Sequence, residues 1–199
     1  MANVDRPFGF RAVQNVAGTA PEIRHFSATT NTTFYQGQPV ALADTGLLVA
    51  WTTTTAVTGN TVGVAMYGVT GAAGSATPDV AVYVDPDQVY EVQSDDSSLT
   101  VATDYLGALA RTVNHSAGNA TLLRSSGELD GSSATSVTGK AATNVAPLHI
   151  LDIADGIDNE IGSSISWTRF KVKFIPSVHL YGSPTIGLAA ATNLYTGVL

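Results

Sequence analysis

Short runs of apolar and β-branched residues, each ended by turn residues, recur from about residue 34 to residue 182. Within these runs apolar positions alternate with small or polar ones, which is typical of strands that bury one face. A sustained period of 3.6 residues, which a buried helix requires, is nearly absent. The sequence therefore predicts an all-β protein, either a single-domain β-barrel or a jelly-roll sandwich.

Two segments predict pairs of strands joined by tight turns. Residues 39–51, PVALADTGLLVAW, place two apolar runs on either side of Asp44 and Gly46, which suit a hairpin turn. Residues 79–93, DVAVYVDPDQVYEVQ, place valines at alternate positions before a turn at residues 85–88. A strand, a turn and a second strand are the expected repeating unit.

Residues 61–69, TVGVAMYGV, predict a strand that packs closely against a neighbour. Val62, Val64 and Met66 are expected on one face because strand side chains alternate between the two faces. Gly63 leaves room on the other face for a close approach of another segment.

The second half of the chain is less regular. Residues 105–113 have apolar positions three and four apart and predict a short helix. Residues 125–144 contain almost no core-forming residue and predict a long exposed loop. Strand character returns at residues 146–154 and 167–182.

The two ends differ from the middle of the chain. Residues 1–33 mix aromatic and polar positions without a stable period, and from residue 174 to residue 199 no charged side chain occurs. We expect an N-terminal arm at 1–33, a β domain at 34–182 and a C-terminal arm at 183–199. The uncharged tail is expected to be covered, either as the last strand of the same barrel or by lying on a neighbouring subunit.

Composition limits the classes of partner. Nine Lys and Arg against 16 Asp and Glu give a formal net charge of -7, which argues against a general affinity for nucleic acid. Only 13% of residues are charged, and weakly charged surfaces are often covered by other subunits. No cysteine, signal peptide or membrane-spanning run is evident, so we expect synthesis in a cytoplasm and no membrane partner.

No motif predicts catalysis or a cofactor. The four histidines are scattered and lack the spacing of a zinc site, and no G-x-S-x-G nucleophile motif occurs. The carboxylates within residues 152–160, DIADGIDNE, are candidates for calcium binding, although Asp-Gly and Asp-Asn pairs are also ordinary turn formers. We therefore expect a protein without enzymatic activity, with cation binding at 152–160 left open.

One charge pattern stands out in residues 168–174, TRFKVKF. Arg169, Lys171 and Lys173 alternate with aromatic and apolar residues and are expected to share the outward face of a strand. This basic face is either a solvated strand guarded at its edge by lysines or a salt-sensitive contact to an acidic partner surface.

Three stretches resemble structural proteins of tailed-phage heads. The opening MANVDRPFGFRAV resembles the M-A-N-x-D-R-P-x-G-F-R-P-V start of small head proteins, with Ala12 where that pattern has proline. GQPVALADTGLLVAW followed by NTVGVAMYGV is similar to a hairpin and strand of capsid cement and decoration proteins. Residues 147–182 are similar to their closing segment, whereas residues 94–145 lie outside the resemblance.

The resemblance implies a β-barrel or jelly-roll protein of the virion that binds the outside of the major capsid protein lattice as a dimer or trimer. The expected partner contacts are Phe8, Phe10 and Arg11 near one end, and Leu194 and Tyr195 near the other. The nearest alternative is a tail-tube or head-completion subunit. A carbohydrate-binding or hydrolytic virion protein and a host-receptor binder are more distant alternatives.

Overall fold

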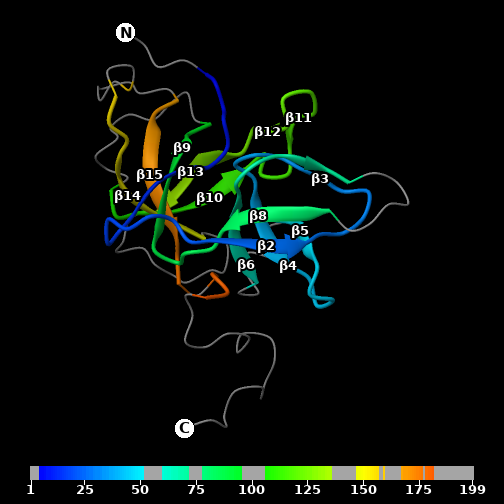
Figure 1. Ribbon diagram of the computed structural model, residues 1–199. Helices are drawn as coiled ribbons and strands as arrows, with labels where there is room; N and C mark the ends of the chain where they lie inside the picture. Colours follow the sequence, from blue (N-terminus) through cyan, green and yellow to red (C-terminus); the bar gives the residue numbers. More distant parts are fainter. Residues whose placement is uncertain are drawn as a thin grey trace, which may run out of the picture.

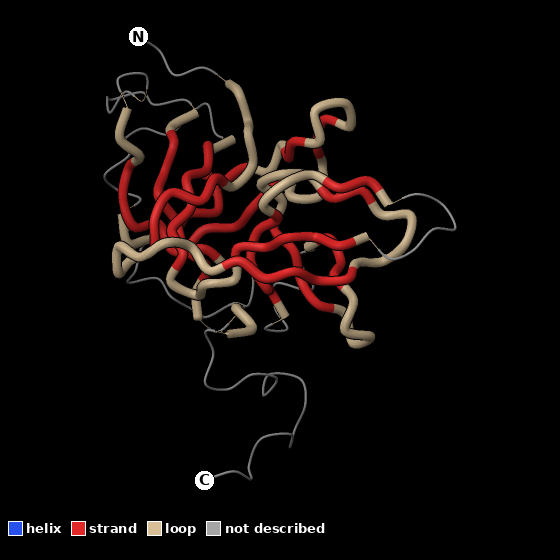
Figure 2. The backbone as a smooth tube through the Cα atoms, viewed as in Figure 1, coloured by secondary structure: helices blue, strands red, loops and turns tan. Residues whose placement is uncertain are grey.

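The computed structural model describes residues 5–51, 60–71, 78–95, 106–135, 147–156, 159, 167–176 and 178–181, with the backbone alone at 131–135. This part of the chain consists of strands and loops without a helix (Figure 2). It accordingly contains no helix long and apolar enough to span a membrane. The predicted all-β class is confirmed.

One half of the molecule is a six-stranded antiparallel sheet (Figure 1). Its pairings are all antiparallel, and it has an edge strand on each side. In spatial order the strands are β1 (Arg11–Asn15), β9 (Gln88–Gln93), β15 (Arg169–Phe174), β14 (Leu148–Ile153), β10 (Leu109–Val113) and β13 (Glu128–Thr135).

The other half is a five-stranded antiparallel sheet beside the first (Figure 1). In spatial order its strands are β2 (Ile23–Ser27), β8 (Asp79–Tyr83), β6 (Thr61–Ala65), β4 (Pro39–Leu42) and β5 (Leu48–Ala50). Two short ribbons complete the described strands: β3 (Thr33–Phe34) with β7 (Val69–Thr70), and β11 (Gly118–Asn119) with β12 (Arg124–Ser125).

The described strands do not form a closed barrel. β13, at one edge of the six-stranded sheet, comes back toward the end of β9, where the Asp95 N–H donates to the Leu129 carbonyl at 3.0 Å. A single bridge between Ser94 and Leu129 marks this approach, and no continuous ladder joins the two strands.

Each sheet has its own buried cluster of apolar side chains. Alternate residues of β15 point into the first cluster, where Phe170, Val172 and Phe174 are at most 1% exposed. The valines of β8 and the residue after it lie in the second cluster, as predicted for residues 79–93. The second cluster contains Val80, Val82, Val84, Val40, Val62, Leu48 and Phe34.

The predicted hairpin at 39–51 is confirmed, since β4 and β5 pair around the turn. Gly46 has a φ of +77° there, which glycine adopts without strain. The turn at 85–88 is also confirmed, with the Gln88 N–H donating to the Asp85 carbonyl at 3.1 Å. The strands that it joins do not pair with each other: β8 belongs to one sheet and β9 to the other.

Gly63 makes the close approach expected of it. A Cβ atom at this position would lie 1.8 Å from the Tyr83 carbonyl oxygen, so β6 and β8 pair only because the side chain is absent. The expectation that Val62 and Val64 share one face is wrong. They lie in different buried clusters because the pairing of β4 with β6 contains an irregularity at this point.

The expected N-terminal arm at 1–33 is not confirmed, since several of its described residues form strands of the two sheets. β1 pairs with β9 and β2 pairs with β8, so this segment follows the β8–β9 connection across both sheets. The Val16 N–H donates to the Asp87 carbonyl at 3.0 Å, and the Val84 N–H donates to the Glu22 carbonyl at 3.0 Å. Both strands are mostly exposed, so backbone pairing holds them without an alternating apolar pattern.

Two further expectations are wrong. Within residues 105–113, β10 is a strand that pairs with β13 and β14, and tertiary pairing outweighs the apparent helical spacing. Within the expected loop at 125–144, residues 128–135 form β13, an edge strand that pairs with β10, and residues 136–144 lie outside the described residues. The expected C-terminal arm at 183–199 lies outside the described residues.

Candidate partner-binding site

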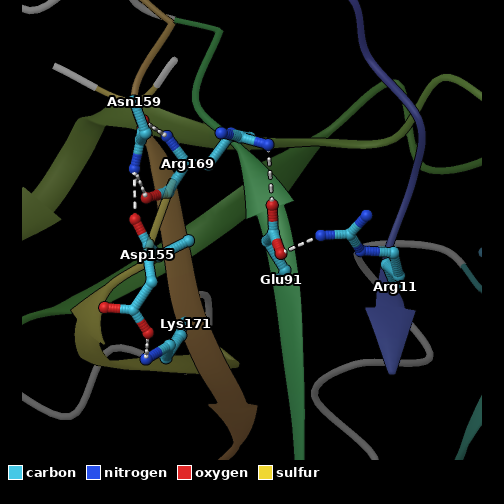
Figure 3. A network of polar contacts seen from close by, with 7 residues as sticks. Arg11, Glu91, Asp155, Asn159, Arg169 and Lys171 are labelled. Atoms are coloured by element: carbon cyan, nitrogen blue, oxygen red, sulfur yellow. Dashed lines mark hydrogen bonds and ion pairs between the residues drawn. The ribbon is translucent and has the colours of Figure 1, made fainter. Parts of the chain in front are cut away.

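A row of alternating charges crosses four neighbouring strands of the six-stranded sheet. Arg11 on β1 stands opposite Glu91 on β9, Glu91 opposite Lys171 on β15, and Lys171 opposite Asp152 on β14. Because directly opposed residues project on the same side of a sheet, each cation has a carboxylate beside it. Figure 3 shows the part of this network around Glu91 and Lys171.

The three cations of β15 each lie close to a carboxylate. Lys171 Nζ lies 2.6 Å from Asp155 Oδ2 (Figure 3). It also lies 3.6 Å from Asp152 Oδ2. Lys173 Nζ lies 3.1 Å from Asp87 Oδ1. Their predicted outward direction is correct, but neighbouring strands and turns supply a carboxylate for each.

The Lys171–Asp155 pair changes the proton affinity of both groups. The hydrogen bond from Lys171, together with its charge, lowers the pKa of Asp155 below its ordinary value. The same hydrogen bond raises the pKa of Lys171. Both groups are therefore charged at neutral pH, and the pair leaves little free positive charge on this part of the surface.

Glu91 is a buried carboxylate held between two arginines. Its side chain is only 5% exposed, and Oε2 accepts a hydrogen bond from Arg11 Nη2 (Figure 3). Oε1 lies 3.3 Å from Arg169 Nη1, an ion-pair distance, although the geometry there is not that of a hydrogen bond. Burying a carboxylate without a charged partner costs free energy, so Arg11 and Arg169 together stabilise Glu91 in its buried position.

The backbone of Arg169 is fixed by Asn159, whose side chain is buried. The Arg169 N–H donates to Asn159 Oδ1 at 2.9 Å, and Asn159 Nδ2 donates to the carbonyls of Arg169 at 3.0 Å and Ala154 at 2.7 Å (Figure 3). This clamp joins the start of β15 to the end of β14. It fixes the backbone from which the Arg169 side chain reaches Glu91.

A cavity of about 380 Å³ opens at the N-terminal edge, where residues before β1 meet both sheets. Four of the nine cationic residues of this acidic chain line it: Arg6, Arg11, Arg124 and Arg169. Its apolar lining includes Phe8, Phe10, Ala12 and Met66. The cavity thus combines a high local density of guanidinium groups with apolar and aromatic surface.

Backbone contacts position the two outer arginines of this cavity. The Arg6 N–H donates to Gln93 Oε1 at 3.1 Å. Arg124 lies between Leu123, whose carbonyl accepts from the Gln36 N–H at 2.7 Å, and Ser125, whose N–H donates to the Gln36 carbonyl at 2.9 Å. Neither guanidinium makes an ion pair within the part of the chain that the structure describes.

The expected contact residues near the N-terminus have different roles. Phe10 is 2% exposed and packs against Tyr90 and Phe174 in the first buried cluster, so its side chain belongs to the core. Phe8 is half-buried, and the Arg11 guanidinium lies 5.6 Å from the centre of its ring. Arg11 and Phe8 remain at the surface beside the cavity.

Gly9 explains why the chain turns inward at Phe10. Its φ is +74°, and a Cβ atom would lie 2.7 Å from both the Gly37 carbonyl oxygen and Ser125 Cβ. The Phe10 N–H donates to the same Gly37 carbonyl at 2.8 Å. The glycine and second phenylalanine of the PFGF sequence are therefore structural.

Exposed apolar side chains lie on β1 and β2 and in the segment between them. Val13 on β1, Val16 after it and Ile23 on β2 are 44%, 59% and 42% exposed, respectively. β1 and β2 are edge strands of their sheets. Edge strands that carry apolar side chains are suited to pairing with another chain.

The histidines do not gather into a ligand set. Burial lowers the pKa of His179 to about 4, against the opposing effect of Asp85 and Asp87. Its Nδ1 accepts a hydrogen bond from the Tyr181 N–H at 3.3 Å, which places the proton of the neutral ring on Nε2. Burial also lowers the pKa of His115, whose ring packs edge-on against Trp51.

The calcium hypothesis for residues 152–160 can be followed only in part. Asp152 and Asp155 both contact Lys171, and Asp158 and Glu160 lie outside the described residues. Among the residues that the structure describes, no three histidine or carboxylate side chains converge as a metal site would require.

Sequence reasoning missed Glu91, Arg6 and Arg124. Glu91 occupies an outward position of a strand, and only the pairing of β9 with both β1 and β15 identifies its partners. Arg6 and Arg124 are 118 positions apart in the sequence, and no local pattern links them. The expected contacts Leu194 and Tyr195 lie outside the described residues.

Comparison of this sequence with models of known protein families and with curated proteins finds no match.

Proposed function

We propose that this protein is a non-enzymatic structural subunit of a tailed-phage head that binds the outside of the major capsid protein lattice and stabilises it. The proposal assigns no catalytic residue and no cofactor. It rests on the resemblance of the MANVDRPFGFRAV, 37–51 and 60–69 stretches to head cement proteins, together with the surface at the described residues of the first stretch.

The observation that carries the proposal is the exposed N-terminal edge. The segment with the most distinctive resemblance leads into β1, and β1 and β2 lie at the edges of the two sheets. Val13, Val16 and Ile23 leave apolar surface there, beside the arginine-lined cavity. An apolar edge with neighbouring charge supports a role in protein assembly, because both features are completed by a partner.

A more detailed form of the proposal is supported by two observations, the low content of charged residues and the return of β13 toward β9. We propose a barrel-like or jelly-roll body that acts as a dimer or trimer, with residues 183–199 lying on a neighbouring subunit. An oligomer that contacts several copies of one lattice gains affinity because its second contact is effectively intramolecular.

The test is to mix the purified protein with shells of the encoding phage that lack it and to image the shells by electron microscopy. We expect added density at regular positions on the outer surface and a higher temperature of shell disruption. Shells without added density under saturating protein would overturn the proposal. Stacked rings or tubes of the purified protein alone would instead favour the tail-tube alternative.

A further inference from the structure

Four arginines in one cavity are unexpected in a chain with a formal net charge of -7. Guanidinium groups repel one another, and nearby carboxylates or other anions reduce this repulsion. Glu91 supplies one carboxylate, which contacts Arg11 and Arg169. Arg6 and Arg124 have no such compensation within the described residues.

The arrangement around Glu91 is an example, within this protein, of a carboxylate held by two arginines that line the cavity. Its carboxylate meets one guanidinium from β1 and another from the start of β15 (Figure 3). A planar guanidinium matches a carboxylate with two parallel donors, so a second carboxylate entering from outside finds the same kind of donor at Arg6 and Arg124.

The lining favours a protein segment over nucleic acid. The overall charge of -7 repels a polyanion, whose binding gains most of its free energy from many phosphate contacts. Phe8 and Met66 give the cavity apolar walls, which suit a side chain next to the carboxylate. A volume of about 380 Å³ lies at the lower end of the range for ligand pockets and fits one or two side chains.

We propose that this cavity binds an acidic peptide segment of a partner protein, with Asp or Glu carboxylates on Arg6 and Arg124 and an adjacent apolar side chain on Phe8 and Met66. The inference deepens the proposed function by naming the chemistry of the partner segment. Its experiment uses a peptide and no phage particle, so either proposal can fail while the other holds.

The probe is a capped pentapeptide in which two glutamates flank a leucine, titrated into the full-length protein while arginine Nε–H resonances are followed by NMR. We expect saturable shifts at Arg6 and Arg124. The double variant Arg6→Gln/Arg124→Gln is expected to bind the peptide roughly tenfold more weakly, since two charge-assisted hydrogen-bonding groups are removed.

The matched control is Arg24→Gln/Arg111→Gln, which makes the same change in formal net charge, from -7 to -9, outside the cavity. We expect this variant to bind the peptide almost as the unchanged protein does. Equal weakening in both double variants, or equal binding of a peptide with glutamines in place of glutamates, would overturn the proposal. Tighter binding of inorganic phosphate or a short oligonucleotide than of the peptide would show that the occupant is not an acidic peptide.

Discussion

Strand β15 and the segment from Arg6 to Arg11 both mix aromatic and cationic residues, yet their charges meet different surroundings. β15 lies inside the six-stranded sheet, between β9 and β14, and each of its three cations contacts a carboxylate. The N-terminal segment lies at the edge, where Arg11 contacts Glu91 but Arg6 has no ion pair within the described residues.

The comparison shows that the cations on β1 and β15 have carboxylates beside them, whereas Arg6, before β1, and Arg124, on β12, have none within the described residues. A central strand has neighbours on both sides that place carboxylates opposite its cations. An edge strand has a neighbour on one side only, so its other side is completed by solvent or by another protein. In this molecule the edge strands β1 and β2 carry exposed apolar side chains, and β1 also contributes Arg11 and Ala12 to the cavity.

The largest expected effect separates the two phenylalanines of the N-terminal segment. Phe10→Ala is expected to lower the free energy of unfolding by about 4 kcal/mol, because a buried ring is lost and a cavity remains. Phe8→Ala, at a half-buried site, is expected to cost about 1 kcal/mol. Urea unfolding measures both. An equal loss of unfolding free energy in the two variants would contradict the placement of Phe10 in the core.

The next effect concerns the end of β15, where His179 packs against Phe174. Its pKa is about 4 in the folded protein and 6.5 in the unfolded chain, so the unfolded state binds the proton first as the pH falls. The contribution of neutral His179 to the free energy of unfolding is complete above pH 6.5, and about 3 kcal/mol of it is lost as the pH falls toward 4.

The measurement is urea unfolding from pH 7.5 to pH 4 for the unchanged protein and for His179→Gln. The variant is expected to lose stability less steeply over this range. His25→Gln, at an exposed site on β2, is the matched control and is expected to keep the steep dependence. A slope in His179→Gln as steep as in the control would contradict the account of this end of β15.

Glu91 contacts both regions, through Arg11 of the N-terminal segment and Arg169 of β15. Neutralising Glu91 tests whether the stability of the protein depends on this link. Glu91→Gln is expected to lower the free energy of unfolding by about 2 kcal/mol, since Arg11 and Arg169 lose a buried charged partner. Asp87→Asn, which neutralises the exposed partner of Lys173, is expected to cost less than about 0.5 kcal/mol. Thermal unfolding distinguishes the variants, and a smaller loss for Glu91→Gln than for Asp87→Asn would contradict the network.

The smallest effect is on the Lys171–Asp155 pair. Lys171→Gln removes the hydrogen bond and the charge that lower the pKa of Asp155, so this pKa is expected to rise toward its ordinary value. NMR titration of the Asp155 carboxyl carbon measures the change. An unchanged pKa would mean that Lys171 is not its partner in solution.

Much of the fold was predictable from the sequence where buried side chains alternate along a strand. Phe170, Val172 and Phe174 point inward as their spacing indicates, and the hairpin around Gly46 forms as its turn residues indicate. The edge strands β1, β2 and β13 were not predictable in this way. β1 and β2 are mostly exposed and lack the alternating pattern that identifies a strand, and among the described side chains of β13 only Leu129 lies in the first buried cluster.

The candidate site was predictable only in part. Arg11 was identified from the resemblance and Arg169 from its alternation with apolar residues, and both line the cavity. The site also needs Arg124, which β12 brings to the N-terminal segment through Gln36. Contacts between segments so far apart in the sequence arise from the topology of the sheets, which local patterns do not contain.

The most direct test of the central claim compares binding to phage shells by two double variants that each remove two positive charges. We predict that Arg6→Gln/Arg124→Gln, at the uncompensated edge, weakens binding and reduces its dependence on salt. Lys171→Gln/Lys173→Gln, on the compensated strand, should bind as the unchanged protein does. Loss of binding in the β15 variant with normal binding in the edge variant would contradict the account.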